Sequence, residues 1–175
     1  MNINELEEYS KKTKGQADKL LQSTKMLDIL KKFGDVHIVG SYSMDVMYGP
    51  DIDILVETNN IKEKSRSALQ EIVDTEIFRK VEYGDFVKFP MKNRPSGYIL
   101  VLKAEIENVK WEIEVWFLPD VSKQLSEYKQ LKSRITADNR IEILKAKHLR
   151  DISNLDKHKL KSFEIYEQIL GKIAD

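Results

Sequence analysis

The sequence predicts an α+β (α/β) fold, in which a mixed β-sheet with flanking helices is followed by a C-terminal helical segment. Strand-like runs with alternating apolar residues occupy the middle of the chain, helical periodicity precedes and separates them, and only helical periodicity follows Pro119. At 175 residues the chain is about one ordinary domain long. We therefore expect a core at residues 1–120 and a helical segment at residues 121–175 that packs on it.

The N-terminal part is predicted to be helical up to the first strand. Residues 4–33 favour one or two helices, with Gly15 as a possible break and Gly34 as a C-terminal stop. Residues 36–39 are short and β-rich, and they run into a turn at Gly40-Ser41. A short helical stretch then ends near Gly49-Pro50.

The central part is predicted to alternate between strands and one helix. Residues 51–57 form a strand, and residues 62–79 suit an amphipathic crossover helix, which usually joins parallel strands. An edge strand and a loop are expected within residues 80–95. Residues 98–106 and 109–117 are predicted to form a hairpin that turns at Glu107-Asn108. Helices are expected at residues 122–135, 137–152 and 156–173, with Asp156 as the cap of the last.

Composition excludes several classes of chemistry. The 29 Lys and Arg residues balance the 29 Asp and Glu residues, so no net charge favours extended nucleic-acid binding. There is no cysteine, which excludes disulfides, thiolate metal sites and cysteine nucleophiles. No apolar run approaches the length of a membrane span, and the N-terminus has no signal-peptide pattern. We expect a cytoplasmic protein without membrane contact.

Two aspartates one residue apart are the main candidate for chemistry. Asp51 and Asp53 must face the same way because side chains alternate along a strand, while Ile52 and Ile54 face a core. Aspartate is depleted in strands, and like charges on one face repel each other. A divalent cation is the simplest compensation for that repulsion. The alternative is a solvated strand end, with an Asp capping the turn after Gly49-Pro50.

Two further features complete a candidate site. The turn at Gly40-Ser41 opens a short helix whose free N–H groups and hydroxyl suit a phosphate, and Ser43 could assist. Without its partners, however, the same turn is equally well a simple cap. The strand at residues 109–117 carries Glu112 and Glu114 on one face, and either could be a third carboxylate or part of a wet face. A turn that suits a phosphate and carboxylates that suit Mg²⁺ together predict a site for phosphoryl or nucleotidyl transfer.

These residues resemble a known superfamily. Gly40-Ser41, nine intervening residues and Asp51-Ile52-Asp53 are similar to the signature of the DNA polymerase β-like nucleotidyltransferases. The run from Ile113 to Pro119 is similar to their third-carboxylate strand. The closest resemblance is to small stand-alone members, namely the minimal nucleotidyltransferases paired with toxins and the antibiotic-modifying transferases. The resemblance implies a nucleotidyltransferase fold.

The resemblance also implies a mechanism with two metals. Asp51, Asp53 and Glu114 would be the catalytic, metal-binding residues for Mg²⁺ or Mn²⁺. Gly40, Ser41 and Ser43 are the expected contacts of the nucleotide phosphates, and Lys147, on a basic helix, could neutralise the triphosphate. A nucleoside monophosphate would pass from a nucleoside triphosphate, ATP by default, to a hydroxyl of a small molecule, a protein or an RNA end, with release of pyrophosphate. For Lys147, a solvated helix face is the competing interpretation.

Two departures from the superfamily pattern matter. The third carboxylate is a Glu where Asp is more frequent, and Pro50 precedes Asp51 where many relatives have Ser. Glu114 is preferred over Glu112 because it lies five residues before Pro119 in an apolar run.

Two other functions compete with the transferase hypothesis. The small size is compatible with a regulatory module of the same fold, such as an antitoxin with a partner toxin. A metal-dependent nuclease or phosphatase would explain the carboxylates but not the Gly-Ser turn.

Overall fold

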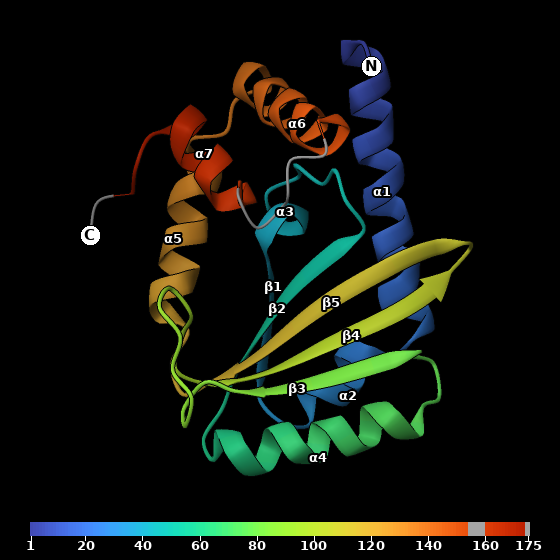
Figure 1. Cartoon of the computed structure of the whole chain (residues 1–175), viewed down its shortest axis with the longest axis vertical. Helices are drawn as coiled ribbons and strands as arrows, with labels where there is room; N and C mark the ends of the chain where they lie inside the picture. Colours follow the sequence, from blue (N-terminus) through green and yellow to red (C-terminus); the bar gives the residue numbers. More distant parts are fainter. Residues whose placement is uncertain (154–159, 174–175) are drawn as a thin grey trace.

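The sheet has five strands and mixed direction. The computed structural model describes residues 1–153 and 160–173. The strands are β1 (Asp35–Val39), β2 (Asp51–Glu57), β3 (Lys80–Asp85), β4 (Tyr98–Ile106) and β5 (Val109–Leu118), in the spatial order β1-β2-β5-β4-β3 (Figure 1). Only the central pair, β2 and β5, is parallel, and the other three neighbouring pairs are antiparallel.

One face of the sheet is covered by the helices of the first half of the chain. These are α1 (Ile3–Ser23), α2 (Met26–Lys31) and α4 (Ile61–Asp74). Their buried apolar residues pack with the inward residues of β2, β4 and β5 in the largest core cluster. Ile52, Ile54 and Val56 supply that core from β2, which leaves Asp51, Asp53 and Leu55 for the opposite face.

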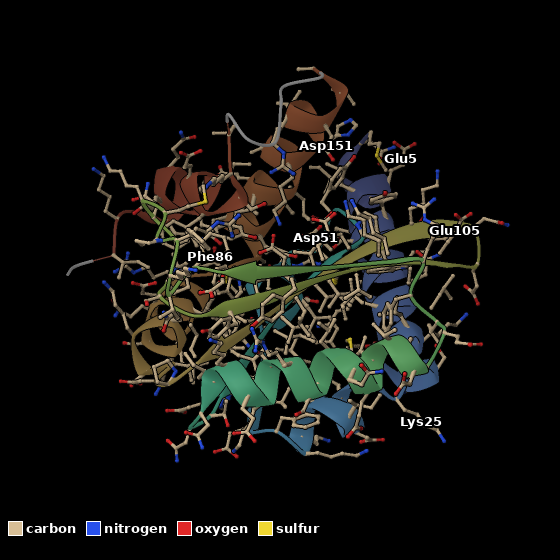
Figure 2. All side chains as sticks on the ribbon, turned by 60° about the horizontal axis from the view of Figure 1, so that its bottom comes forward. Glu5, Lys25, Asp51, Phe86, Glu105 and Asp151 are labelled. Carbon is tan, nitrogen blue, oxygen red and sulfur yellow. The ribbon has the colours of Figure 1, made fainter. Side chains whose placement is uncertain are left out.

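The opposite face looks toward the C-terminal helices. These are α5 (Ser122–Ser133), α6 (Ala137–Ile152) and α7 (Ser162–Leu170). Leu55, Trp116 and Val121 form a smaller core on this side, against which Leu125 and Tyr128 of α5 pack. Figure 2 shows Asp51 on this side of the sheet, away from α4. The carboxylates therefore lie between the sheet and the C-terminal helices.

Most of the predicted elements are confirmed. The strand at Asp51–Glu57 has the predicted bounds, and the hairpin turns at Glu107 and Asn108, which both have positive φ as a two-residue turn of type I′ requires. β3 runs in the same direction as β2, as a crossover helix predicts, but lies at the far edge of the sheet.

Some predicted boundaries are wrong. Gly15 does not break α1, because the helix continues through it, and a Cβ there would meet no other group. α4 ends at Asp74 and not near residue 79. The last helix begins at Ser162, and its predicted cap, Asp156, lies outside the described residues.

Candidate functional site

The two aspartates of β2 lie next to a glycine turn. β1 leads into α3 (Gly40–Ser43), and β1 pairs with β2 so that Val39 is opposite Asp53. Gly40 has φ +67°, a conformation that L-residues rarely adopt, and a Cβ there would collide with Oδ2 of Asp53. Only glycine therefore lets the chain turn this close to the carboxylate.

The third and fourth carboxylates come from the parallel neighbour of β2. In the register of β2 and β5, Asp53 is opposite Glu114 and Asp51 is opposite Glu112. Glu112 is paired with Lys103 at 3.1 Å, and Glu114 is paired with Arg94 at 3.4 Å. The register thus brings together the acidic residues that the sequence predicted, on one face of two adjacent strands.

Asp53 has a strongly perturbed acidity. Burial, with the negative charges of Asp51 and Glu114, raises its pKa to about 7, and the positive charges of Lys147 and Arg94 oppose this rise. A carboxyl group with this pKa at an acidic cluster is a typical feature of a functional site. The same repulsion is what a bound cation would relieve.

All four carboxylates line one cavity of about 660 Å³. Gly40 and Ser41 line it from the start of α3, and cationic residues line it from several other elements. These are Arg94 from the loop between β3 and β4, Lys110 from β5, Arg150 from α6 and Lys161 at the start of α7. The polar and aromatic residues that also line it are Asn93, Trp116, Gln124, Tyr128, Ser162, Phe163 and Tyr166.

Lys147 and Ser43 do not line this cavity. The Lys147 side chain is 2% exposed, and its Nζ donates to the Val46 carbonyl at 2.8 Å and lies 5.0 Å from the centre of the Tyr166 ring. Burial lowers its pKa to about 8. Ser43 Oγ donates to the Gly40 carbonyl at 3.0 Å. Both therefore stand behind the wall of the cavity, and their predicted role in nucleotide binding stays a prediction.

Other cavity residues were missed from the sequence. Arg150 is three residues after Lys147 on the same helix, and helical periodicity does not distinguish the two residues. It is 6% exposed and is held by Asp151, by Ser162 and by the Leu160 carbonyl. No sequence pattern pointed to Lys161 and Ser162, because the packing of α7 against α6 places them at the cavity.

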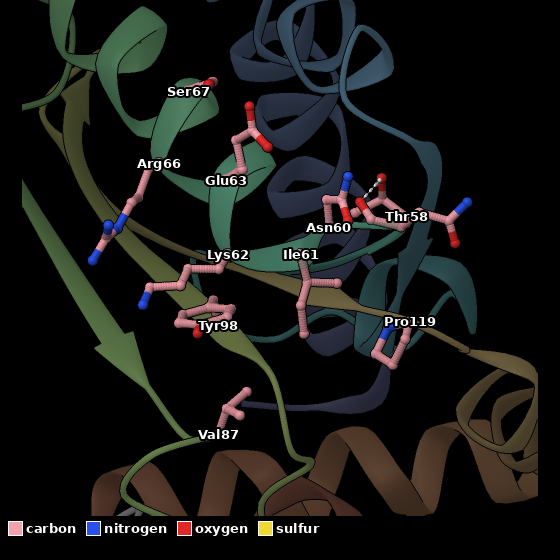
Figure 3. Close-up of a pocket in the computed structure, with 11 residues that line it drawn as sticks. Thr58, Asn60, Ile61, Lys62, Glu63, Arg66, Ser67, Val87, Tyr98 and Pro119 are labelled. Atoms are coloured by element: carbon pink, nitrogen blue, oxygen red, sulfur yellow. Dashed lines mark hydrogen bonds between the residues drawn. The ribbon is translucent and has the colours of Figure 1, made fainter.

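A second hollow lies away from these carboxylates. It has a volume of about 910 Å³ and borders the start of α4, the end of β5 and Val87 (Figure 3). Lys62 and Arg66 of α4 contribute its positive charges, and Tyr98 contributes an aromatic ring. None of the predicted site residues lines it.

The donor set fits a divalent cation that is shared with a substrate. Within residues 1–153 and 160–173, no group of three or more His, Asp or Glu side chains converges closely enough to hold an ion alone. Mg²⁺ is commonly held by one or two carboxylates together with substrate phosphates and water. Asp51 and Asp53, with Glu114 opposite, supply hard oxygen atoms of that kind, and burial together with the neighbouring negative charges raises the pKa of Asp53.

In the described part of the chain, no helix combines the length and the apolar character needed to cross a membrane. No protein-family model matches the sequence, and no curated protein matches it.

Solved structures with a similar fold do exist. One is the polymerase core of TRAMP, an RNA surveillance complex, with a TM-score of 0.59 and 20% identity, covering 87% of this chain and 47% of that chain. A second is a cytoplasmic RNA terminal U-transferase, with a TM-score of 0.58 and 12% identity over 95% of this chain and 52% of that chain. A third is the Cid1 poly(U) polymerase with Mg and 3′-dATP, with a TM-score of 0.54 and 13% identity over 96% and 54%.

The chain spans about half the length of these three structures. At 20% identity and below, the likeness concerns the fold. The mixed sheet with its flanking helices matches theirs, so the chain shares their fold, which is the fold that its resemblance to nucleotidyltransferases implied.

Proposed function

We propose that this protein is a metal-dependent nucleotidyltransferase, which transfers a nucleoside monophosphate from a nucleoside triphosphate to an acceptor hydroxyl and releases pyrophosphate. The observation that supports this most is the register of β2 and β5, which sets Asp53 beside Glu114 in a cavity that also contains Gly40 and Ser41. Mg²⁺ or Mn²⁺ is the proposed cofactor, with Asp51, Asp53 and Glu114 as its ligands.

The two sides of the cavity suit the two substrates. Ser41, Arg150 and Lys161 offer a hydroxyl and two positive charges on the helical side, which suits the triphosphate. Arg94 and Lys110 lie on the strand side, close to Glu114 and Glu112, which suits the acceptor. ATP is the default nucleotide, and Gln124 and Tyr166 are available for contacts with it.

The reaction assigns a task to each carboxylate. The acceptor oxygen bonds to the α-phosphorus while the bond from that phosphorus to the bridging oxygen of pyrophosphate breaks. Glu114 accepts the proton of the acceptor hydroxyl. Asp51 and Asp53, with Glu114, would hold the cofactor, which when bound would neutralise phosphate charge and lower the pKa of the hydroxyl.

The acceptor is proposed to be the 3′ end of a short RNA. The names of the similar structures include an RNA terminal U-transferase and a poly(U) polymerase, which supports RNA over a small molecule or a protein side chain. The balanced net charge of the chain argues for a short contact with RNA and not for an extended one.

The test is incubation of the protein with each labelled nucleoside triphosphate, a short RNA and Mg²⁺ or Mn²⁺. Asp53→Asn should abolish transfer, whereas Glu57→Gln, at the other end of the same strand, should leave it unchanged. If the wild type shows neither transfer nor metal-dependent nucleotide binding under any of these conditions, the proposed function is wrong. Nucleotide binding without transfer would instead favour the regulatory module.

A further inference from the structure

Arg94 has an unusual place in the site. It lies in the loop between β3 and β4, whose start is marked by Phe86 in Figure 2. Its Nη1 donates to Oε2 of Glu114 at 3.4 Å, and its guanidinium lies 5.8 Å from the centre of the Trp116 ring. Both partners are on the same face of β5, two residues apart. Arg94 therefore rests on the strand that carries the third carboxylate.

The positive charge of Arg94 acts on the site in the way that a metal ion would. Its guanidinium lies beside Glu114, which is opposite Asp53 in the register of β2 and β5. It also uses an oxygen of Glu114 that a divalent cation would need as a ligand. A divalent cation and the guanidinium would therefore compete for the same oxygen of Glu114 and for the same place beside the carboxylates.

We propose that Arg94 is a placeholder cation: it neutralises Glu114 in the metal-free site, and it leaves both Glu114 and the Trp116 ring when the divalent cation binds. This inference rests on the metal-dependent function proposed above. It makes Arg94 a positioning residue, which sets the metal affinity and keeps Glu114 in place before the substrates arrive.

The local structure permits this exchange without a change in the fold. The Arg94 side chain is 38% exposed and Glu114 is 26% exposed, so the ion pair is partly screened and weak. Trp116 keeps its contact with Phe86, whose ring centre is 5.2 Å away, when Arg94 turns outward. Only the rotamer of Arg94 has to change.

Lys103 provides a matched control. It pairs with Glu112 at 3.1 Å, and Glu112 is opposite Asp51 in the same register that sets Glu114 opposite Asp53. Removing Lys103 or Arg94 deletes one positive charge beside one glutamate. A change in metal binding that comes only from the lost charge should therefore appear in both variants. A change in the response of Trp116 should appear only when Arg94 is replaced.

The experiment reads the exchange at the indole. Trp111 and Trp116 are the two tryptophans of the chain, so a Trp111→Phe background isolates the emission of Trp116. Mg²⁺ should shift this emission saturably when Arg94 is present, and Arg94→Met should lack the shift while Lys103→Met keeps it. Free Mn²⁺, followed by electron paramagnetic resonance, should show about 1.4- to 5-fold tighter binding to Arg94→Met, the range that corresponds to an exposed ion pair of about 0.2–1 kcal/mol.

The outcomes separate this inference from the proposed function. If Mn²⁺ binds but Trp116 does not respond, or if Arg94→Met binds Mn²⁺ no more tightly than its parent, the placeholder role is wrong and the metal-dependent function stands. If no variant binds Mn²⁺, with or without a nonhydrolysable nucleoside triphosphate, both are wrong. Arg94→Lys, which keeps the charge, gives an intermediate affinity and serves if Arg94→Met fails to fold.

Discussion

Asp53→Asn should stabilise the metal-free protein, and the effect should depend on pH. Burial and the neighbouring carboxylates raise the pKa of Asp53 from 3.8 to about 7, so the folded state binds its proton more tightly than the unfolded chain does. Between about pH 4 and pH 7 the unfolded chain carries the charge and the folded protein does not. The free energy of unfolding therefore falls as pH rises through this window.

The magnitude follows from the same values. A difference of about 3 pKa units corresponds to about 4 kcal/mol at about 1.4 kcal/mol for each unit. Because Asp53 is only partly buried and faces an open cavity, solvent reduces this figure to about 2 kcal/mol. Asparagine is neutral at every pH, so Asp53→Asn avoids the loss.

Urea unfolding with a chelator, at intervals from pH 4 to pH 8, measures the effect. The variant should match the wild type near pH 4 and exceed its free energy of unfolding by about 2 kcal/mol at pH 8. Glu57→Gln, on the same strand, should show no such trend. If the free energies of unfolding of Asp53→Asn and the wild type differ by the same amount at every pH in this range, the environment of Asp53 does not disfavour its charged form and the reasoning is wrong.

Three other perturbations test the rest of the site. Mg²⁺ at pH 8 should raise the melting temperature of the wild type and not of Asp53→Asn, as differential scanning fluorimetry would show, because only the charged carboxylate gains from the cation. Gly40→Ala should cost about 1–2 kcal/mol in urea unfolding from its positive φ alone, and it should also weaken nucleotide binding in a fluorescence titration because the Cβ displaces Asp53. Glu114→Gln should lower the transfer rate about 100-fold or more in the labelled-nucleotide assay, whereas Glu112→Gln should lower it less than about 3-fold; the reverse order would make Glu112 the third carboxylate.

The sequence predicted the strands of the site well because their signals are local. Alternation of apolar and acidic residues in β2 and β5 determines which face each side chain takes, and the glycine before Ser41 marks the turn that Asp53 requires. The hairpin at Glu107-Asn108 then fixes the register of β4 on β5. Each of these features depends on residues that are close together in the sequence, so each could be predicted without the structure.

The residues that α6 and α7 contribute to the cavity could not be predicted from such local patterns. Lys147 and Arg150 are three residues apart on α6, yet one lies behind the cavity and the other lines it. The difference arises from the packing of α6 against α7, where Tyr166 covers the Lys147 ammonium and Ser162 accepts from Arg150. Helical periodicity places Lys147 and Arg150 on the same side of α6. Which of the two reaches the cavity depends on how α7 packs against α6, and the sequence of α6 does not contain that information.

The electrostatics connect these two parts of the site. The carboxylates of β2 and β5 repel each other whenever no cation is present, and two cations from distant parts of the chain offset this repulsion. Lys147 is buried and its ammonium is held in place by the Val46 carbonyl, whereas Arg94 is partly exposed and can leave. A fixed cation maintains the folded site, and an exchangeable one leaves room for the metal ion. Replacing Lys147 should therefore reduce the free energy of unfolding more than replacing Arg94, while only the Arg94 variant should bind metal more tightly.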